Sequence, residues 1–386
     1  MRSAPRPIAP SPYTSIALAL VVLALMAVVA AGQSSELDVF LRRKMAEAHA
    51  PGLAATIVKQ DQVVWSGVYG LRDVEKALPV LPDTPFMLAS ISKTITGTAL
   101  MQLREDGRFR LDDDVDPHLS FPVDHHSWPG APISFRMLLS HVGGIQDNWS
   151  VMVPLYSRGD SPVRLGHFLE NYLVPGGTWY FPFQNYTPWP PGAAFRYSNV
   201  GFALNGLLVQ EISGQPFDQY CNQNVFAPLG MDHTSWRVAD FRPDEVAMPH
   251  TWNGQSQSFE NHYQYGYPDY PDGALRSSAL DLSRFLLAHM NGGEHAGARI
   301  LEAATVAEMQ TVQFPALEAT QGLAFHYWSY NGWTLLGHAG GDTGVYTEMW
   351  FRPEDGVGVV LLANGNATIP VMFEVLVRLF EEGALL

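Results

Sequence analysis

A serine and a lysine three residues apart, Ser90 and Lys93, stand in the small and apolar stretch FMLASISKTITGTALMQL. On a helix, residues i and i+3 lie on one face, so these two side chains are expected to meet. A serine hydroxyl attacks a carbonyl carbon when a base takes its proton, and a lysine becomes such a base when burial lowers its pKa. The positive end of the helix acts in the same direction. We therefore predict Ser90 as a nucleophile and Lys93 as its base.

Lysine is rare in this chain, which sets Lys93 apart. Only four lysines occur, Lys44, Lys59, Lys76 and Lys93, and none follows Lys93. Arginine provides the other basic side chains, but arginine stays protonated and cannot act as a base. The alternative is a solvated lysine at the start of a helix, because this spacing of serine and lysine arises by chance in many proteins.

Two further motifs could complete a catalytic site. Tyr197 and Asn199 lie in FRYSNVGFALNG, directly before a predicted helix, and His338 lies in LLGHAGGDTGV on a predicted strand. A buried tyrosine near a lysine can deliver a proton to a leaving group. An amide such as that of Asn199 can orient the lysine and the substrate. The glycines after His338, Gly340 and Gly341, would let a substrate approach backbone donors closely.

With these motifs in order, the chain resembles the serine β-lactamase and penicillin-binding-protein superfamily, in the class C β-lactamase-like branch that includes D-peptidases and esterases. SISK, YSN and HAG carry the resemblance, and LLSHVGGI, PPGAAFRYSN, VFAPLGMDHTSW and GALRSSALDLSRF also match. The similarity runs from about residue 37 to the C-terminus. It implies an α/β (α+β) fold of the β-lactamase/transpeptidase type, with an antiparallel sheet flanked by helices and an inserted helical lobe.

The resemblance also implies roles for the individual residues. Ser90 would form an acyl-enzyme, with Lys93 as general base, and Tyr197 would protonate the leaving group and help to activate the deacylating water. Asn199 would hydrogen-bond Lys93 and the substrate. The backbone N–H groups of Ser90 and Gly341 would form the oxyanion hole.

One position departs from the pattern of the class C β-lactamases proper. His338 stands where those relatives have the lysine of Lys-Thr-Gly, which meets the carboxylate of a β-lactam. A neutral histidine binds a carboxylate less well than a lysine. The departure favours esters and peptides over β-lactams as substrates.

The elements that must position these residues can be read from periodicity and turn signals. Strands are predicted in residues 52–73, with a turn at 60–62, and in residues 332–341 and 346–364, with a turn at 353–356. Helices are predicted at 35–49, 86–103, 133–141, 199–214, 279–293 and 370–382. The strands cluster at both chain ends, so we expect an α/β lobe of about 36–88 and 270–386 and a helical lobe of about 89–269.

Two aromatic-rich loops, residues 178–192 and 258–273, remain open in function. They are either irregular, well-packed loops or an apolar wall of a substrate pocket.

Composition excludes several other classes of protein. The formal net charge of −15 argues against nucleic acid or an anionic membrane surface as a partner. The sequence lacks H-E-x-x-H and G-x-x-x-x-G-K, so we predict no metal, no nucleotide and no cofactor. The single cysteine, Cys221, cannot form an internal disulfide. We expect it to be a core residue of a helix, the alternative being a cysteine nucleophile.

The N-terminus has the pattern of a targeting segment. Arg2 and Arg6 precede an unbroken apolar run, residues 16–31, which ends in small residues. The run is short for a membrane span, so residues 1–32 are predicted to be a signal peptide of a periplasmic or secreted protein. The alternative is an uncleaved membrane anchor at residues 16–31. No cysteine lies near the end of the run, which excludes a lipoprotein signal.

Together these observations predict a serine hydrolase in residues 36–386 that acts through an acyl-enzyme on a carboxylic ester or a (D-)amino-acid peptide or amide. Three alternatives stay open. They are a β-lactamase or D-Ala-D-Ala carboxypeptidase, an acyltransferase, and a catalytically inactive binding protein or acylation sensor on the same fold.

Overall fold

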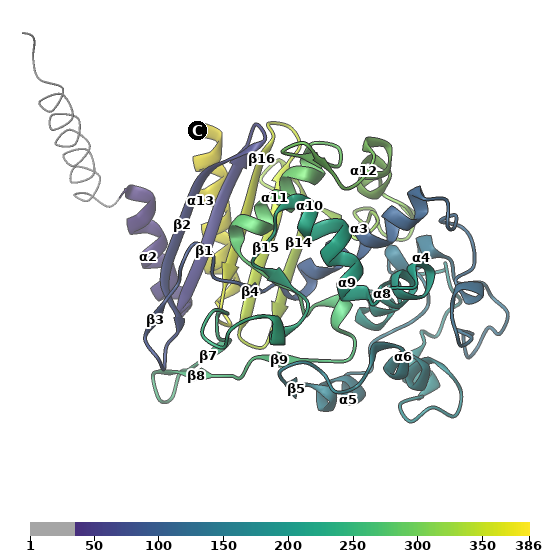
Figure 1. Ribbon diagram of the computed structural model, residues 1–386. Helices are drawn as coiled ribbons and strands as arrows, with labels where there is room; N and C mark the ends of the chain where they lie inside the picture. Colours follow the sequence, from purple (N-terminus) through teal and green to yellow (C-terminus); the bar gives the residue numbers. More distant parts are fainter. Residues whose placement is uncertain (1–34) are drawn as a thin grey trace, which may run out of the picture. The chain divides into compact units, whose positions relative to one another are not determined.

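The computed structural model describes residues 35–386 (Figure 1). The predicted signal peptide, residues 1–32, and the alternative anchor, residues 16–31, lie outside this range. Within residues 35–386 no helix is both long enough and apolar enough to span a bilayer. Residues 45–386 group into one unit, which carries all of the predicted site residues and is the unit described below.

The first helix, α2 (Glu36–Ala48), begins where its capping signal predicts. The Ser35 hydroxyl accepts a hydrogen bond from Asp38 N (3.1 Å), and the Asp38 carboxylate accepts one from Ser35 N (3.1 Å). This reciprocal pair satisfies amide groups that an α-helix leaves free at its start.

An antiparallel sheet built from both chain ends forms the scaffold. Its order is β13-β14-β15-β16-β1-β2-β3, so the first strand of the chain pairs with the last. The bounds are β1 (Gly52–Lys59), β2 (Gln62–Asp73), β3 (Leu78–Pro79), β13 (His326–Tyr330), β14 (Trp333–Asp342), β15 (Val345–Arg352) and β16 (Val357–Ala363). The predicted turn between β1 and β2 is confirmed, and its residues Gln60 and Asp61 both adopt positive φ, 51° and 62°.

Helices cover both faces of this sheet. On one side of β1 the Thr56 hydroxyl lies 2.6 Å from that of Ser283 in α11 (Ala279–Met290). On the other side Ile57 packs against α13 (Ile369–Leu385) at Gly383. A Cβ added to Gly383 would lie only 2.8 Å from the Ile57 side chain, so only glycine allows this close approach. Figure 1 shows α11 and α13 on opposite sides of the strands. Buried on both faces, β1 and β16 are accordingly almost wholly apolar.

The middle of the chain is mainly helical and packs beside α11. Two buried helices cross there, α3 (Ser92–Glu105) and α8 (Asn199–Ser213), and α8 ends as predicted at Gly214 in the left-handed conformation (φ 72°). Cys221 lies in the core at the end of α9, as predicted, and burial raises the pKa of its thiol. The remaining helices are α4 (Phe135–Leu139), α5 (Trp149–Met152), α6 (Leu165–Leu173), α7 (Pro182–Asn185), α9 (Phe217–Cys221), α10 (Ala227–Leu229) and α12 (Ala303–Gln310).

Short strands tie the loops of this helical region to one another. They form one three-stranded and three two-stranded sheets. Their bounds are β4 (Phe86–Met87), β5 (Ser157–Arg158), β6 (Thr234–Ser235), β7 (His250–Asn253), β8 (Ser258–Asn261), β9 (Tyr265–Gly266), β10 (Arg276–Ser277), β11 (Glu294–His295) and β12 (Ala298–Arg299).

Candidate active site

Ser90 does not lie inside a continuous helix, which corrects the prediction of a helix from residue 86. Residues 86 and 87 form the strand β4, Ser90 lies on a single 3₁₀ turn (Ala89–Ile91), and α3 begins at Ser92. Ala89 adopts a positive φ of 48°, a conformation that a non-glycine residue rarely takes. Such backbone strain persists where surrounding contacts hold it and is frequent at active sites.

The backbone before Ser90 is held from two sides. The Leu88 carbonyl accepts a hydrogen bond from the Thr347 hydroxyl of β15 (2.7 Å), and Leu88 N donates to the Leu275 carbonyl (2.8 Å). The turn that carries Ser90 is thus attached both to the sheet and to the loop before α11.

Lys93 is fully buried and makes three hydrogen bonds. Its Nζ donates to Ser90 Oγ (3.2 Å), to Asn199 Oδ1 (2.7 Å) and to the Asp272 carbonyl (2.8 Å). An ammonium group has three donors and no acceptor, so this arrangement satisfies all of them. The predicted meeting of Ser90 and Lys93 is therefore observed, and Asn199 is the third member of the cluster.

The expected direction of the Lys93 pKa shift is wrong. Burial does lower this pKa, but the negative potential of Tyr197 and Asp272 raises it, and the net direction is upward from the ordinary value. The sequence argument counted desolvation and the helix end and did not know which charges would gather around the amine. This upward direction favours the ammonium form at rest.

Asp147 fixes the amide of Asn199, a role that the sequence did not reveal. Its Oδ2 accepts from Asn199 N (3.0 Å) and Nδ2 (2.9 Å), while Oδ1 accepts from Ser198 Oγ (3.1 Å) and Val200 N (3.1 Å). Since Nδ2 is engaged by Asp147, Oδ1 must face Lys93. The Asp147 carboxylate also accepts hydrogen bonds from backbone N–H groups that have no partner within α8 at its start, and its charge is favourable at that end of the helix. Asp147 lies in a loop far from α8 in sequence, where no local motif marks it.

Tyr197 lies beside Lys93 and is held by a histidine. The Lys93 Nζ is 5.0 Å from the centroid of the Tyr197 ring, and the His141 ring stacks on that ring at 4.2 Å. His141 Nδ1 accepts a hydrogen bond from Ser198 N (3.1 Å). Burial, together with the Lys93 charge, lowers the pKa of His141 well below its ordinary value, so the ring is neutral. Its contacts are those of a structural histidine.

His338 is buried on β14 and its ring centroid lies 6.3 Å from that of Tyr197. Its Nδ1 is 2.6 Å from the Ala339 carbonyl; because a carbonyl only accepts, Nδ1 carries the proton and Nε2 is left as an acceptor. Burial, followed by His326 and Lys93, lowers the pKa of His338 well below its ordinary value. His326, whose ring lies 4.8 Å away, is a neighbour that the motifs did not indicate.

The two glycines of β14 differ in what surrounds them. A Cβ on Gly340 would lie 2.3 Å from the Leu88 carbonyl and 2.3 Å from Thr347 Oγ1, so only glycine lets β14 run this close to the Ser90 turn. A Cβ on Gly341 would meet nothing within 4 Å. Gly341 instead lines a small cavity together with Ser90 and Asn199.

That cavity, of about 110 Å³, is the space next to the Ser90 hydroxyl. Its walls include the aromatic side chains of Trp149, Tyr156 and Tyr267, and three carboxyl side chains complete it: Asp269, Asp272 and Asp342. The aromatic loop 258–273 thus contributes Tyr267 and two acids, whereas residues 178–192 contribute nothing to this cavity. Trp149 and the acids were not among the predicted site residues, although PDYPDG does place two acids three residues apart.

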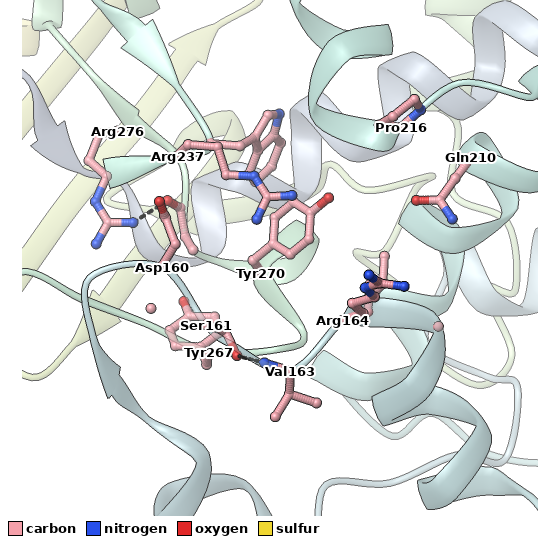
Figure 2. Close-up of a pocket in the computed structure, with 15 residues that line it drawn as sticks. Asp160, Ser161, Val163, Arg164, Gln210, Pro216, Arg237, Tyr267, Tyr270 and Arg276 are labelled. Carbon is pink, nitrogen blue, oxygen red and sulfur yellow. Dashed lines mark hydrogen bonds between the residues drawn. The ribbon is translucent and has the colours of Figure 1, made fainter. Parts of the chain in front are cut away.

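A second cavity, of about 340 Å³, shares only Tyr267 with the first. Figure 2 shows Arg164, Arg237 and Asp160 around it, with Arg276 at one side. It contains none of the predicted catalytic residues. The smaller, acidic cavity, which Ser90 lines, is therefore the candidate substrate site.

Comparison with known proteins agrees with this architecture. A model of the Beta-lactamase family matches residues 37–381. The chain is 24% identical over 340 residues to Protein flp of Staphylococcus aureus (strain NCTC 8325 / PS 47), covering 88% of this chain and only 65% of that protein. It is 26% identical over 339 residues to Penicillin-binding protein 4 of Amycolatopsis lactamdurans, covering 83% and 82% of the two chains.

Among solved structures, the D-amino acid amidase from Ochrobactrum anthropi SV3 complexed with L-phenylalanine amide superposes with a TM-score of 0.71. Sequence identity is 22%, over 89% of this chain and 96% of the amidase, a likeness that establishes the fold alone. The predicted α/β fold of the β-lactamase/transpeptidase type is confirmed. By its fold, its ordered motifs and the match over most of its length, the chain belongs to the Beta-lactamase family, whose members are serine acyl-enzyme hydrolases and penicillin-binding proteins.

Proposed function

We propose that this protein is a serine hydrolase that acts through an acyl-enzyme on Ser90, with a carboxylic ester or an amino-acid amide as substrate. The observation that carries the proposal is the hydrogen bond of the fully buried Lys93 Nζ to Ser90 Oγ (3.2 Å). A catalytically inactive binding protein would have no need to retain this contact together with the ordered Asn199 and Asp147.

In the acylation step, Ser90 Oγ attacks the substrate carbonyl carbon and its proton passes to the Lys93–Tyr197 pair. The raised pKa of Lys93 favours its ammonium form at rest. We therefore assign the proton-accepting state to the form in which the pair has already lost one proton, with the two groups acting as one unit. The bond to the leaving alcohol or amine then breaks, and Tyr197 returns the proton to it. Water completes the cycle by attacking the acyl-enzyme, which releases the acid and regenerates Ser90.

We assign the stabilisation of the negative charge that develops on the carbonyl oxygen to hydrogen bonds from the backbone N–H groups of Ser90 and Gly341. Both residues line the acidic cavity, and preorganised donors of this kind contribute about 3–4 kcal/mol each to an acyl-transfer transition state.

Charge favours esters and amides over substrates that carry a carboxylate. No lysine or arginine lines the cavity among the described residues, and His338 is neutral. The carboxylate of a penicillin or a D-Ala-D-Ala peptide belongs to the leaving part of the substrate, and it would meet the neutral His338 where Lys-Thr-Gly relatives have a lysine. These two substrate classes rank below esters and amino-acid amides.

The test is intact-mass spectrometry and turnover with three separate acyl donors: a short-chain activated ester, a penicillin and a D-Ala-D-Ala peptide. We expect an adduct or product with the ester that is absent from the Ser90→Ala variant. An adduct that persists in Ser90→Ala would refute the nucleophile. If no donor, including a free amino-acid amide, gives either adduct or product, the enzyme assignment fails and the binding-protein alternative takes its place.

A further inference from the structure

The acidic lining of the cavity beside Ser90 goes beyond what acyl-enzyme chemistry requires. Acylation uses the serine, the lysine–tyrosine pair and two backbone donors, whereas Asp269, Asp272 and Asp342 have no part in it. All three carboxyl groups nevertheless belong to mostly buried residues that line this cavity. The charge of Lys93 acts on Asp269 and Asp272 and that of Arg276 on Asp342, but no lysine or arginine of the described residues donates a hydrogen bond to these carboxyl groups. Burying carboxyl groups without such a direct partner is unfavourable, so the arrangement needs a reason.

Asp272 is the clearest case. The residue is only 4% exposed, and its Oδ2 accepts no hydrogen bond from the N–H and O–H donors of the described residues. Lys93 donates a hydrogen bond to the backbone carbonyl of Asp272 and not to this Oδ2. The carboxyl of Asp269 (3% exposed) lies against it, and burial together with this mutual repulsion raises the pKa of Asp272 well above its ordinary value. A cationic ligand placed between the two carboxyl groups would relieve this repulsion.

Asp342 closes the cavity on the side of Gly341. Its carboxylate oxygens accept weakly from the Tyr156 hydroxyl (3.3 and 3.4 Å), and Oδ1 accepts from Thr343 N (2.7 Å). Trp149, half exposed, and Tyr267 supply aromatic surface at the same cavity. Carboxylates and aromatic faces together form the environment that binds organic ammonium groups.

The geometry also identifies which part of a substrate would enter. Neither Tyr197 nor His338 lines the cavity, whereas Ser90 and Gly341 do. A leaving group must depart toward the proton donor Tyr197, and so the cavity receives the acyl part. A metal ion is the weaker occupant, because within residues 35–386 no three His, Cys, Asp or Glu side chains converge to ligate one ion.

We propose that this cavity binds a free ammonium group on the acyl part of the substrate, so that the preferred donors are amino-acid amides or esters, or peptides with a free N-terminal residue. The inference rests on the proposed acyl-enzyme function and specifies its substrate class. The volume of about 110 Å³ suits an ammonium and the first carbons attached to it.

The test compares acyl donors that differ only at the amine. Phenylalanine amide, N-acetylphenylalanine amide and 3-phenylpropionamide, with the corresponding ethyl esters, are assayed with the full chain for kcat/KM, in both D and L forms where chiral. We expect the free amine to be preferred by about 10- to 100-fold, the range of a hydrogen bond to a charged group. Equal rates for the amine and its neutral analogues would overturn the inference.

Variants of the three aspartates test whether a preference for free-amine donors arises in this cavity. Asp269→Asn, Asp272→Asn and Asp342→Asn each remove one carboxyl, and we expect the ratio of amine to neutral donor to fall at least fivefold in the first two. Asp232→Asn removes the same charge from an exposed residue outside the cavity and should leave the ratio unchanged. A ratio that is unaffected in all three cavity variants would also overturn the inference.

If a variant does not fold, competitive inhibition of the unmodified protein tests the same inference. With the neutral ester as reporter, phenethylamine should inhibit competitively at concentrations at least tenfold below those of 3-phenylpropionate; equal inhibition contradicts the proposal. Ser90-dependent turnover of the neutral ester without any amine preference would refute only this inference. No acylation by any donor would refute the proposed function as well.

Discussion

At the scale of single residues, Lys93 shows that charge outweighs burial in setting the protonation of this site. The amine is completely enclosed, which alone would favour its neutral form. Its acceptors and the negative potential of Tyr197 and Asp272 reverse that preference and raise its pKa. The lysine therefore orders Ser90, Asn199 and the Asp272 backbone through its hydrogen bonds, and in the proposed mechanism it would transfer protons jointly with Tyr197.

Lys93→Arg should reduce the rate of acylation at least 100-fold. Arginine stays protonated, and its planar fork cannot reproduce three hydrogen bonds from one nitrogen. The measurement is the single-turnover rate of Ser90 acylation by the neutral ester. Lys76→Arg is the matched control, because Lys76 is a half-exposed lysine paired with Asp244 (2.8 Å), and its activity should stay within twofold. Equal rates for both variants would refute a role for Lys93 in proton transfer.

At the scale of elements, the close approach of β14 to the Ser90 turn depends on Gly340. Gly340→Ala places a methyl group 2.3 Å from the Leu88 carbonyl, so the strand or the turn must move. We expect a loss of about 1–3 kcal/mol in the free energy of unfolding, the usual penalty for overpacking, and a greater than tenfold loss of acylation. Denaturant unfolding and the single-turnover rate measure these two effects.

Gly341→Ala is the companion variant, because its Cβ would point into open space and its backbone N–H is retained. Its stability should stay within about 0.5 kcal/mol of the unmodified protein, as for other changes without new contacts. Equal destabilisation by both substitutions would show that strand flexibility, not close approach, explains the effect.

On β15, Glu348 couples stability to pH. It is 7% exposed and accepts from Tyr346 Oη (2.6 Å) and Trp350 Nε1 (2.5 Å). Burial raises the pKa of its carboxyl to about 7, above the ordinary 4.5. Between these two values the folded protein keeps a proton that the unfolded chain has lost, so this residue makes the free energy of unfolding fall as pH rises.

Glu348→Gln should weaken that pH dependence, because an amide does not titrate. The difference in Tm between the variant and the unmodified protein should shift in favour of the variant from pH 5 to pH 8, as followed by thermal unfolding. Glu354→Gln, in the exposed turn between β15 and β16, should show no such trend. Parallel behaviour of the two variants would contradict a role for the buried carboxyl.

Much of the fold could be predicted from local signals. The β1–β2 hairpin, the cap of α2, the Gly214 end of α8 and the final helix all follow patterns of a few adjacent residues. The site was predictable where motifs are short, as for Ser90 with Lys93. The helix start was missed because the positive φ of Ala89 is imposed by contacts with β15 and residue 275. Asp147 and the acids of the cavity were missed because only tertiary folding brings them to Ser90.

At the scale of the whole molecule, the N-terminal segment determines where the enzyme would act. If residues 1–32 are a signal peptide, expression of the full chain in a bacterial host should yield a periplasmic or secreted product that begins near residue 33. N-terminal sequencing and intact mass of each cell fraction test this. Full-length protein confined to the membrane fraction would instead support an anchor at residues 16–31.

The position of β1 between β2 and β16 bears on when the chain can fold during its synthesis. Leu53 of β1 aligns with Ala363 of β16, so β1 leaves the ribosome 310 residues (363 − 53) before its pairing partner. Contacts between such distant segments form slowly. Until β16 has been made, one edge of β1 lacks its strand and the central sheet cannot close. If the chain is exported, a late-closing sheet of this kind would keep it in a translocation-competent state while it passes through a membrane.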